Sequence, residues 1–347
     1  MAGFLDALNS LIWSPALVFL CLGAGVYFTI VTKGLQIRCI PDMIAQLKNG
    51  EKSDSGVSSF QSLMISLAGR VGVGNIAGVA TAIAFGGPGA VFWMWAVALL
   101  GSATSFVECT LAQVYKEKDQ DTGEYRGGPA YYIEKAYRHT SVGPFMLVYG
   151  VIFAVSMILA TSYFLPGIQA NGVAAAVENA WGVNVTWSAV ILAGVLAFII
   201  IGGVKRIANF TSLIVPFMAA AYIIIALTIL FMNFGDIPHV FGLIFKSAFD
   251  MEAGFAGMLG SAIMWGVKRG IYSNEAGQGT GPQSAAAAEV SHPAKQGLVQ
   301  SFAVYVDTLF VCSATAFIII STDMYKVFEG ESEDGAVRYA GSLPDGI

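Results

Sequence analysis

Long apolar runs, separated by short polar stretches, follow one another along nearly the whole chain. A helix that crosses a bilayer needs about 20 mostly apolar residues. By this measure the pattern predicts transmembrane helices near residues 15–32, 58–86, 89–114, 143–165, 187–203, 208–232, 254–271 and 298–320. The predicted fold class is therefore an all-α integral membrane protein with eight spans in these 347 residues.

Composition supports this fold class and excludes several others. Hydrophobic residues make up 56% of the chain and charged residues 12%, whereas a soluble domain carries about 25% charged residues. So few charges could not cover the surface of a soluble enzyme or sustain a disordered chain. The net charge of −5 also argues against nucleic acid as a partner. We expect a lipid bilayer as the surroundings, and the sequence indicates no protein partner.

The basic residues predict how the chain lies in the membrane. Lys33, directly after the first predicted span, is the first of them, and cytoplasmic loops are enriched in Lys and Arg. With the N-terminus outside, fourteen basic residues fall in inner loops and three in outer loops. We therefore expect a multi-pass protein of the plasma (inner) membrane with its N-terminus outside.

Two predicted spans are interrupted by glycines. The second carries Gly72, Gly74 and Asn75, and the seventh carries Gly266 after Met264. Each glycine destabilises a helix interior by about 1 kcal/mol relative to alanine. Irregular backbone at membrane depth persists only where it is buried in protein or lines a cavity. We predict helix breaks at residues 71–75 and 264–266, as in the substrate site of an inverted-repeat transporter.

These two interruptions divide the chain into three parts. Residues 1–57 would form an extra N-terminal transmembrane helix and an inner loop. Residues 58–232 would form a first repeat of five helices, the first of them broken. Residues 233–347 would begin a second repeat, with a broken helix at 254–271, an inner loop, a helix at 298–320 and an outer loop.

A helix break offers two kinds of ligand. Its free N–H groups and positive helix end suit a substrate carboxylate, and its free carbonyls suit Na⁺. We therefore predict substrate contacts from Gly72, Gly74 and Asn75. Gly72 and Asn75 would form part of a Na⁺ site, largely through backbone carbonyls. The alternative is plain helix packing, because Gly74 and Gly78 form a G-x-x-x-G pair.

The second break and one further residue complete the predicted substrate site. Carbonyls before Gly266 would receive the substrate ammonium, while Ile263 and Met264 would bound the pocket. Alternatively, this segment is a helix end anchored at the membrane interface. Gln169, just after Pro166, either contacts the substrate carboxylate from a third helix or lies in an outer loop.

Arg70 is an ionisable residue inside a predicted span, and such residues mark functional sites by default. We predict a gate or a structural ion pair with Glu275, and Glu108 is the other possible partner. The segment 126–132 is an inner loop that either belongs to a gate or is an ordered connecting turn.

Several motifs in this sequence resemble the alanine/glycine:cation symporter family, also called the sodium:alanine symporters. They are RVGVGNIAGVA at 70–80, GGPG at 86–89 with FWMW at 92–95, RGGPAYYI at 126–133, and MWGVKRGIYSNEAG at 264–277 with AAAA at 285–288. The resemblance implies a leucine-transporter-like fold of five plus five helices after one extra helix. It also implies Na⁺-driven uptake of alanine, glycine or similar small neutral amino acids. It places Asn75, Gln169 and residues 264–266 at the amino-acid site.

The chain departs from this family in two respects. Val73 stands where the family usually has threonine between the two glycines. The family has about eleven spans, so we expect the last three to lie beyond Ile347 and the chain to be the N-terminal portion of a longer protein. Without them, it should insert into membranes but not carry out coupled transport alone.

The sequence therefore predicts a Na⁺-coupled secondary transporter working by alternating access, with Na⁺ as the coupling ion. The alternatives are a cation channel and a symporter coupled to H⁺. A channel would need polar residues along a continuous pore, whereas here they converge on two predicted breaks. We do not expect an enzyme, because the three histidines, His139, His239 and His292, all fall in predicted loops.

Overall fold

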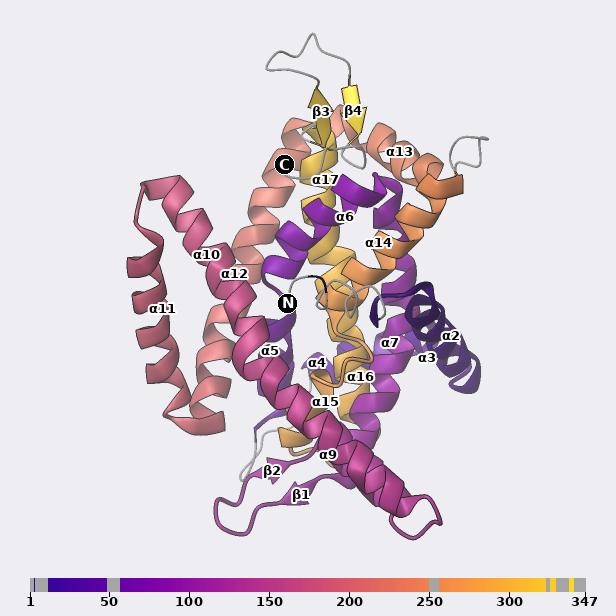
Figure 1. Cartoon of the computed structure of the whole chain (residues 1–347), viewed down its shortest axis with the longest axis vertical. Helices are drawn as coiled ribbons and strands as arrows, with labels where there is room; N and C mark the ends of the chain where they lie inside the picture. The colour runs from indigo at the N-terminus through magenta and orange to yellow at the C-terminus, as the bar shows by residue number, and fades with distance from the viewer. Residues whose placement is uncertain are drawn as a thin grey trace.

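The computed structural model describes residues 3, 12–48, 57–249, 256–322, 325–328 and 337–339. Most of the predicted outer loop at 321–347 and part of the inner loop before the second span lie outside these residues. The described part is mostly helical, as the apolar pattern predicts (Figure 1).

The elements follow the predicted spans closely. The first group is α2 (Pro15–Val31), α3 (Leu35–Arg38), α4 (Ile40–Lys48), α5 (Ser59–Arg70), the π-helical η1 (Gly74–Gly78), α6 (Val79–Gly86) and α7 (Gly89–Tyr115). The middle group is β1 (Glu117–Lys118), β2 (Tyr125–Arg126), α8 (Pro129–Tyr137), α9 (Gly143–Leu159), the π-helical η2 (Ala160–Phe164), α10 (Leu165–Trp181), α11 (Val185–Ile200) and α12 (Gly203–Met232). The last group is η3 (Phe234–Asp236), α13 (Ile237–Phe249), α14 (Ala256–Asn274), α15 (Gly281–Ala287), α16 (Pro293–Val304), the π-helical η4 (Tyr305–Cys312), α17 (Ser313–Ser321), β3 (Lys326–Phe328) and β4 (Val337–Tyr339).

Four stretches within the described residues are long and apolar enough to cross a membrane. They are Gly89–Tyr115, Gly143–Trp181, Gly203–Met232 and Pro293–Ser321. A fifth is added if the bent pair of α5 with η1 and α6 counts as one span. The apolar helices α2 and α11 are shorter. The multi-pass helical architecture is thus confirmed, with four or five spans rather than eight meeting the criteria of length and composition.

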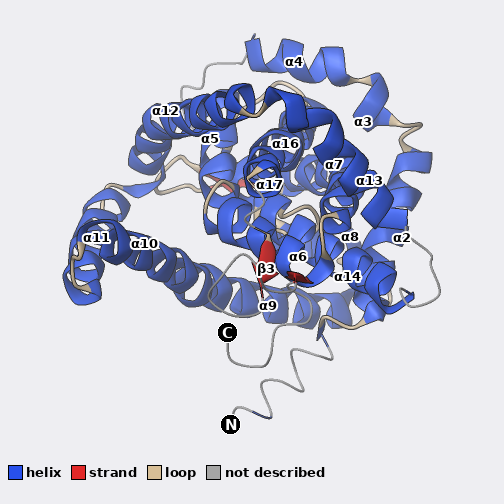
Figure 2. Cartoon of the chain, turned by 90° about the horizontal axis from the view of Figure 1, so that it is seen from above, coloured by secondary structure: helices blue, strands red, loops and turns tan. Residues whose placement is uncertain are grey.

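Helix α7 lies at the centre of the bundle and packs against α14, α16, α15, α2 and α13. Figure 2 shows α7, α16 and α17 enclosed by the other helices. In Pro293–Ser321, 67% of the most apolar stretch is buried by protein. These central helices carry buried polar side chains, which need protein partners for their hydrogen bonds.

In Figure 1, α9 and α10 run diagonally across the lower end of the bundle to its left side, where α11 follows, and α12 returns to pack against α5 and α17. In Gly143–Trp181 and in Gly203–Met232, 11% of the most apolar stretch is buried, and the exposed apolar side chains suit contact with lipid. The helix continues through Pro166, where we considered a loop as one alternative. The π-helical turn η2 immediately precedes this proline, and π-turns loosen the hydrogen-bond ladder that proline interrupts. Gln169 therefore lies in a helix, and its placement in an outer loop is wrong.

The predicted break at 71–75 is present in the structure. Helix α5 ends at Arg70 because Val71 adopts an extended conformation with ψ of 100°. The chain resumes as η1 and α6, bent by 53° from α5. The second predicted break, at 264–266, is wrong because α14 runs without interruption from Ala256 to Asn274. The helix ends instead where Glu275 takes a left-handed conformation with φ of 55°.

Packing explains why α14 stays helical at Gly266. A β-carbon there would collide with the carbonyl oxygen of Ala90 and lie 2.6 Å from Cβ of Trp93. The glycine thus lets α14 approach the backbone of α7, as small residues do where membrane helices pack closely. Helix α7 occupies the space that a side chain at Gly266 would need.

Candidate functional site

Two carboxamide side chains accept hydrogen bonds from the backbone at the break. The N–H of Gly72 donates to Oδ1 of Asn75 over 2.8 Å, and the N–H of Val73 donates to Oε1 of Gln169 over 3.0 Å. The Gln169 side chain lies close to Gly72, because a β-carbon there would be 2.8 Å from its Oε1 and would displace it. The N–H groups at the break therefore face oxygen acceptors, the chemistry that a carboxylate would also offer.

Asn75 connects the break to two other helices. Its side chain is fully buried, and Nδ2 donates to Oγ of Ser273 over 3.0 Å and to Oδ1 of Asp307 over 2.6 Å. Ser273 comes from the end of α14 and Asp307 from η4. Asn75 therefore joins the break to α14 and η4 through hydrogen bonds, whereas a G-x-x-x-G pair would require only close packing.

Asp307 is the main residue that the sequence analysis missed. It is completely buried and accepts hydrogen bonds from Asn75, from Oγ of Ser273 at 2.9 Å and from Oγ1 of Thr308 at 2.7 Å. An acidic side chain within the apolar run 298–320 is a signal in itself, since ionised groups inside a membrane need a functional or structural reason. The same reasoning that selected Arg70 could have found Asp307.

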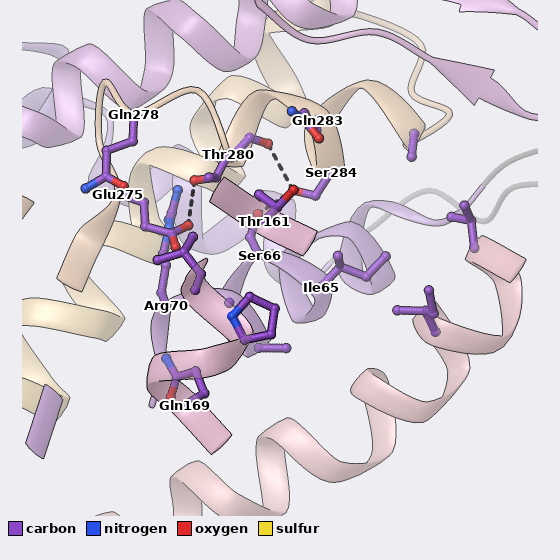
Figure 3. A pocket seen from close by; sticks show the side chains of 18 of the residues that line it. Ile65, Ser66, Arg70, Thr161, Gln169, Glu275, Gln278, Thr280, Gln283 and Ser284 are labelled. Carbon is purple, nitrogen blue, oxygen red and sulfur yellow. Dashed lines mark hydrogen bonds between the residues drawn. The ribbon is translucent and has the colours of Figure 1, made fainter. Parts of the chain in front are cut away.

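A cavity of about 590 Å³ lies beside this polar centre. Arg70, Gly74, Gln169 and Glu275, all predicted site residues, are among the residues that line it. Figure 3 shows side chains from several helices around this space, with Ser66, Ser284, Thr280 and Gln278 supplying further polar groups. The structure thus brings together residues that are far apart in the sequence.

Arg70 is buried at the end of α5. Nη1 donates to the carbonyl of Gln300 over 3.4 Å, whereas Nε and Nη2 have no hydrogen-bond partner among the described residues. Its charge acts on Glu108, Glu275 and Asp307. Arg70 thus has no carboxylate among its hydrogen-bond partners in the described residues, so the predicted direct pair of Arg70 with Glu275 is not formed.

The two carboxylates near Arg70 are held by the loop that follows α14. Oε2 of Glu275 accepts the hydroxyl of Thr280 over 2.6 Å. Oε1 of Glu108 accepts the N–H of Gly277 over 3.0 Å. The positive charge of Arg70 therefore acts on several carboxylates at longer range. The short hydrogen bonds of Glu275 and Glu108 come from neutral groups.

Ile263, Met264 and Gly266 do not join this cavity. Ile263 and Met264 pack in an apolar cluster with Val18 of α2 and Val97 of α7. None of the three is among the described residues that line the cavity. Between them Trp265 stacks on Phe85, with ring centroids 4.8 Å apart. The carbonyls of this segment remain inside a continuous helix, so the structure gives them no free position for a substrate ammonium.

The segment at 126–132 is both an ordered turn and part of the cavity wall. Strands β1 and β2 form a hairpin that is fastened by the ion pair of Arg126 with Asp119, 2.8 Å long. Arg126 and Gly127 line the cavity.

The hairpin also shifts the pKa values of two of its side chains. Backbone N–H groups of Thr122 and Asp121 lower the pKa of Asp119. At the base of the hairpin, burial lowers the pKa of Lys116 to about 8.

Comparison with known proteins places the whole chain in one family. A model of the family described as "Sodium:alanine symporter family" matches residues 1–343. The chain is 57% identical over 338 residues to the "Putative sodium/proton-dependent alanine carrier protein YrbD" of Bacillus subtilis (strain 168), covering 97% of this chain and 67% of that protein.

Two further relatives are more distant. The "Probable sodium/glutamine symporter GlnT" of the same organism is 48% identical over 319 residues, covering 91% of this chain and 65% of that protein. The "Sodium/alanine symporter AgcS" of Methanococcus maripaludis is 43% identical over 328 residues, covering 94% and 71%. The chain therefore spans about two thirds of the length of these relatives. With a family match over nearly all of its residues, this chain belongs to the sodium:alanine symporter family of membrane transport proteins and not to a family of enzymes.

Proposed function

We propose that this protein couples the inward movement of Na⁺ to uptake of a small neutral amino acid, such as alanine or glycine, across the plasma membrane. The observation that carries the proposal is the helix break, where the N–H groups of Gly72 and Val73 meet side-chain oxygens. The buried carboxylate of Asp307 is joined to the same break through Asn75. Sites for an anionic group and for a cation therefore adjoin each other.

The substrate carboxylate would bind at the N–H groups of the break, with Gln169 and Asn75 beside it. The backbone at the break is closely packed, because a β-carbon on Gly74 would lie 3.3 Å from the ring of Tyr272. A substrate held directly against this backbone would need a small side chain, although the adjoining cavity measures about 590 Å³. The name of one relative includes glutamine and those of two others alanine, and the close packing at Gly72 and Gly74 favours the alanine type for this chain.

Na⁺ would bind near Asp307 and Asn75 and take a backbone carbonyl of the break as a further ligand. Hard cations prefer oxygen ligands, and Gly72 offers a carbonyl that here accepts the N–H of Asn75 over 3.1 Å. The names of the relatives mention sodium alone or sodium and proton. A buried carboxylate could bind either ion, so H⁺ coupling is the alternative that the experiment must separate from Na⁺ coupling.

Alternating access requires a structural frame that can open to each side. We propose a leucine-transporter-like inverted repeat for this family member, with residues 58–232 as the first repeat and the N-terminus outside. The bend of 53° between α5 and α6 supports this arrangement, since discontinuous helices at mid-membrane are typical of such repeats. A cation channel is less favoured, because the polar side chains gather at one break, whereas a channel would need them along a continuous pore.

Uptake of radiolabelled alanine into membrane vesicles tests the proposal. Because these 347 residues are not expected to carry out coupled transport alone, the vesicles come from cells that produce the full-length protein. They are compared with and without an inward Na⁺ gradient, and separately with an inward H⁺ gradient. We expect accumulation with the Na⁺ gradient and competition by unlabelled alanine and glycine. Equal uptake with and without Na⁺ would overturn Na⁺ coupling. Accumulation driven by the H⁺ gradient alone would favour the alternative.

A further inference from the structure

Three carboxylates and one guanidinium share the interior of this bundle. Glu108, Glu275 and Asp307 expose 7%, 9% and 0% of their surfaces, and Arg70 exposes 2%. The charge of Arg70 acts on all three carboxylates. An isolated ionised group is very costly to bury. Fully ionised, this group of side chains would carry two negative charges without a partner, so protons or bound cations must neutralise them.

One of the two charges is assigned by the proposed function, which places the coupling Na⁺ at Asp307. The other belongs to Glu275 or Glu108, and the cavity distinguishes them. Glu275 lines the cavity together with Arg70, so water and the guanidinium both stabilise its anion. Glu108 is not among the described residues that line the cavity. It lies on α7 behind the loop 275–280 and accepts the N–H of Gly277 from that loop.

The titratable groups around Glu108 offer little further compensation. Arg70 faces it from α5 and Glu275 from the loop after α14. Cys109 is its neighbour on α7, and Tyr132 faces it from α8. A thiol and a phenol are neutral at physiological pH. Arg70 is thus the positive charge in this set, and Glu275 and Asp307 draw on the same charge.

We propose that Glu108 is an exchangeable proton-binding site, distinct from the Na⁺ site at Asp307. Its carboxylate takes up one proton and loses one negative charge, while Oε1 continues to accept the N–H of Gly277. Glu108 is not completely enclosed, since 7% of its surface is exposed, and exchange of the proton requires that this exposed part reach water. This site deepens the proposed transport function, because it adds a proton to the ions that the transporter binds.

Infrared spectroscopy of the purified full chain tests protonation without any need for transport. A protonated carboxyl group gives a C=O stretching band that a carboxylate lacks. At neutral pH we expect this band in the parent and its loss in Glu108→Gln, whose amide imitates the protonated acid in shape and charge. Glu178→Gln, an exposed position on α10, should leave the band unchanged.

A second variant separates Glu108 from its neighbour. Glu275→Gln should retain the protonated-carboxyl band, because Glu275 is the ionised member of the pair. Loss of the band in Glu275→Gln but not in Glu108→Gln would overturn the proposal, as would its absence from the parent. These results do not depend on uptake, so they stand apart from the failure of Na⁺-driven alanine transport.

Transport then shows whether the proton exchanges. In vesicles of the full-length protein, we expect Glu108→Gln to remove the dependence of alanine uptake on pH, because its neutral amide has no proton to exchange. The protein with Glu178→Gln should keep the pH dependence of the parent. An unchanged pH dependence in Glu108→Gln would contradict an exchangeable proton at this residue.

Discussion

Two segments of this protein carry glycines within predicted spans, but they have different structures. Around Gly72 and Gly74, the chain leaves the helix and bends by 53°. Around Gly266 and Gly270, α14 continues as a regular helix. At Gly270 a β-carbon would collide with the side chain of Val97 and lie 3.3 Å from Cα of Met94. The second segment is therefore a packing surface for α7. Its two glycines are four residues apart, as is common where membrane helices pack closely.

What separates the two segments is the chemistry of their neighbours. Backbone groups freed at a break need hydrogen-bond partners where no water is available. The first segment has such partners in Asn75 and Gln169. The second faces Ala90 and Trp93 at a distance that leaves no room for a ligand. A glycine in a membrane helix thus indicates that another group lies close to the helix backbone. Where that group is a polar side chain the helix can break, and where it is another helix the two helices pack together.

The largest expected effect is that of Gly266→Leu. The added side chain would collide with the backbone of α7 at Ala90. Overpacking typically costs about 1–3 kcal/mol, and we expect the upper end because backbone must move. Size-exclusion chromatography after heating would show a lower melting temperature and loss of monodisperse protein.

Gly260→Leu is the matched control for this variant. Gly260 lies on the same helix with nothing within 4 Å of its β-carbon position, so the stability should stay near that of the parent. If Gly266→Leu instead folded as stably as the parent and lost alanine binding alone, the glycine would belong to a pocket. The comparison between the two segments would then fail.

The next effect in size is that of Asn75→Ala. The proposed function places Asn75 beside the substrate carboxylate, and a hydrogen bond to a charged group is worth about 1.5–3 kcal/mol. Nδ2 of Asn75 also donates to the carboxylate of Asp307. We expect alanine affinity to fall by about 10- to 150-fold, with a parallel loss of Na⁺ affinity through Asp307. Isothermal titration with alanine at several Na⁺ concentrations measures both.

Asn179→Ala, at an exposed position on α10, is the control for this titration and should bind like the parent. An alanine dissociation constant within about twofold of the parent's, a difference below 0.5 kcal/mol, would mean that Asn75 only packs. A loss of alanine affinity without any change in Na⁺ affinity would separate Asn75 from the proposed cation site.

The sequence was sufficient to predict those features that depend on local chemistry. The apolar runs predicted the helices, and the cluster of Gly72, Gly74 and Asn75 predicted the bend. Asp307 also lay within reach of sequence reasoning, because it is an acid inside an apolar run. The glycine pattern does not mark this position, although an isolated acid is a stronger signal of function in a span than a glycine.

Other features depend on contacts between distant parts of the chain. Whether Gly266 breaks a helix or packs depends on Ala90 of α7, and no local pattern contains that contact. The proline at 166 also favoured the end of a helix, whereas the π-turn before it lets the helix continue to Gln169. The partner of Arg70 was likewise undecided in the sequence, and the structure shares its charge among three carboxylates.

The smallest expected effect tests the comparison most directly, through a double-mutant cycle. Gly72→Ala would place a β-carbon 2.8 Å from Oε1 of Gln169, and that flexible side chain would have to leave the N–H of Val73. Gln169→Ala removes the same neutral hydrogen bond, worth about 0.5–1.5 kcal/mol or about 2- to 12-fold in alanine affinity.

Because both changes remove one contact, the double variant should bind alanine no more weakly than the weaker single variant, a clear departure from additivity. The matched cycle on α14 pairs Gly266→Ala with Trp93→Ala. There the collision with the carbonyl of Ala90 involves backbone, which truncation of a side chain cannot relieve, so the two losses of stability should add. Additive losses of affinity at Gly72 and Gln169 would show that the glycine of the break, like Gly266, is required by backbone packing and not by the carboxamide beside it.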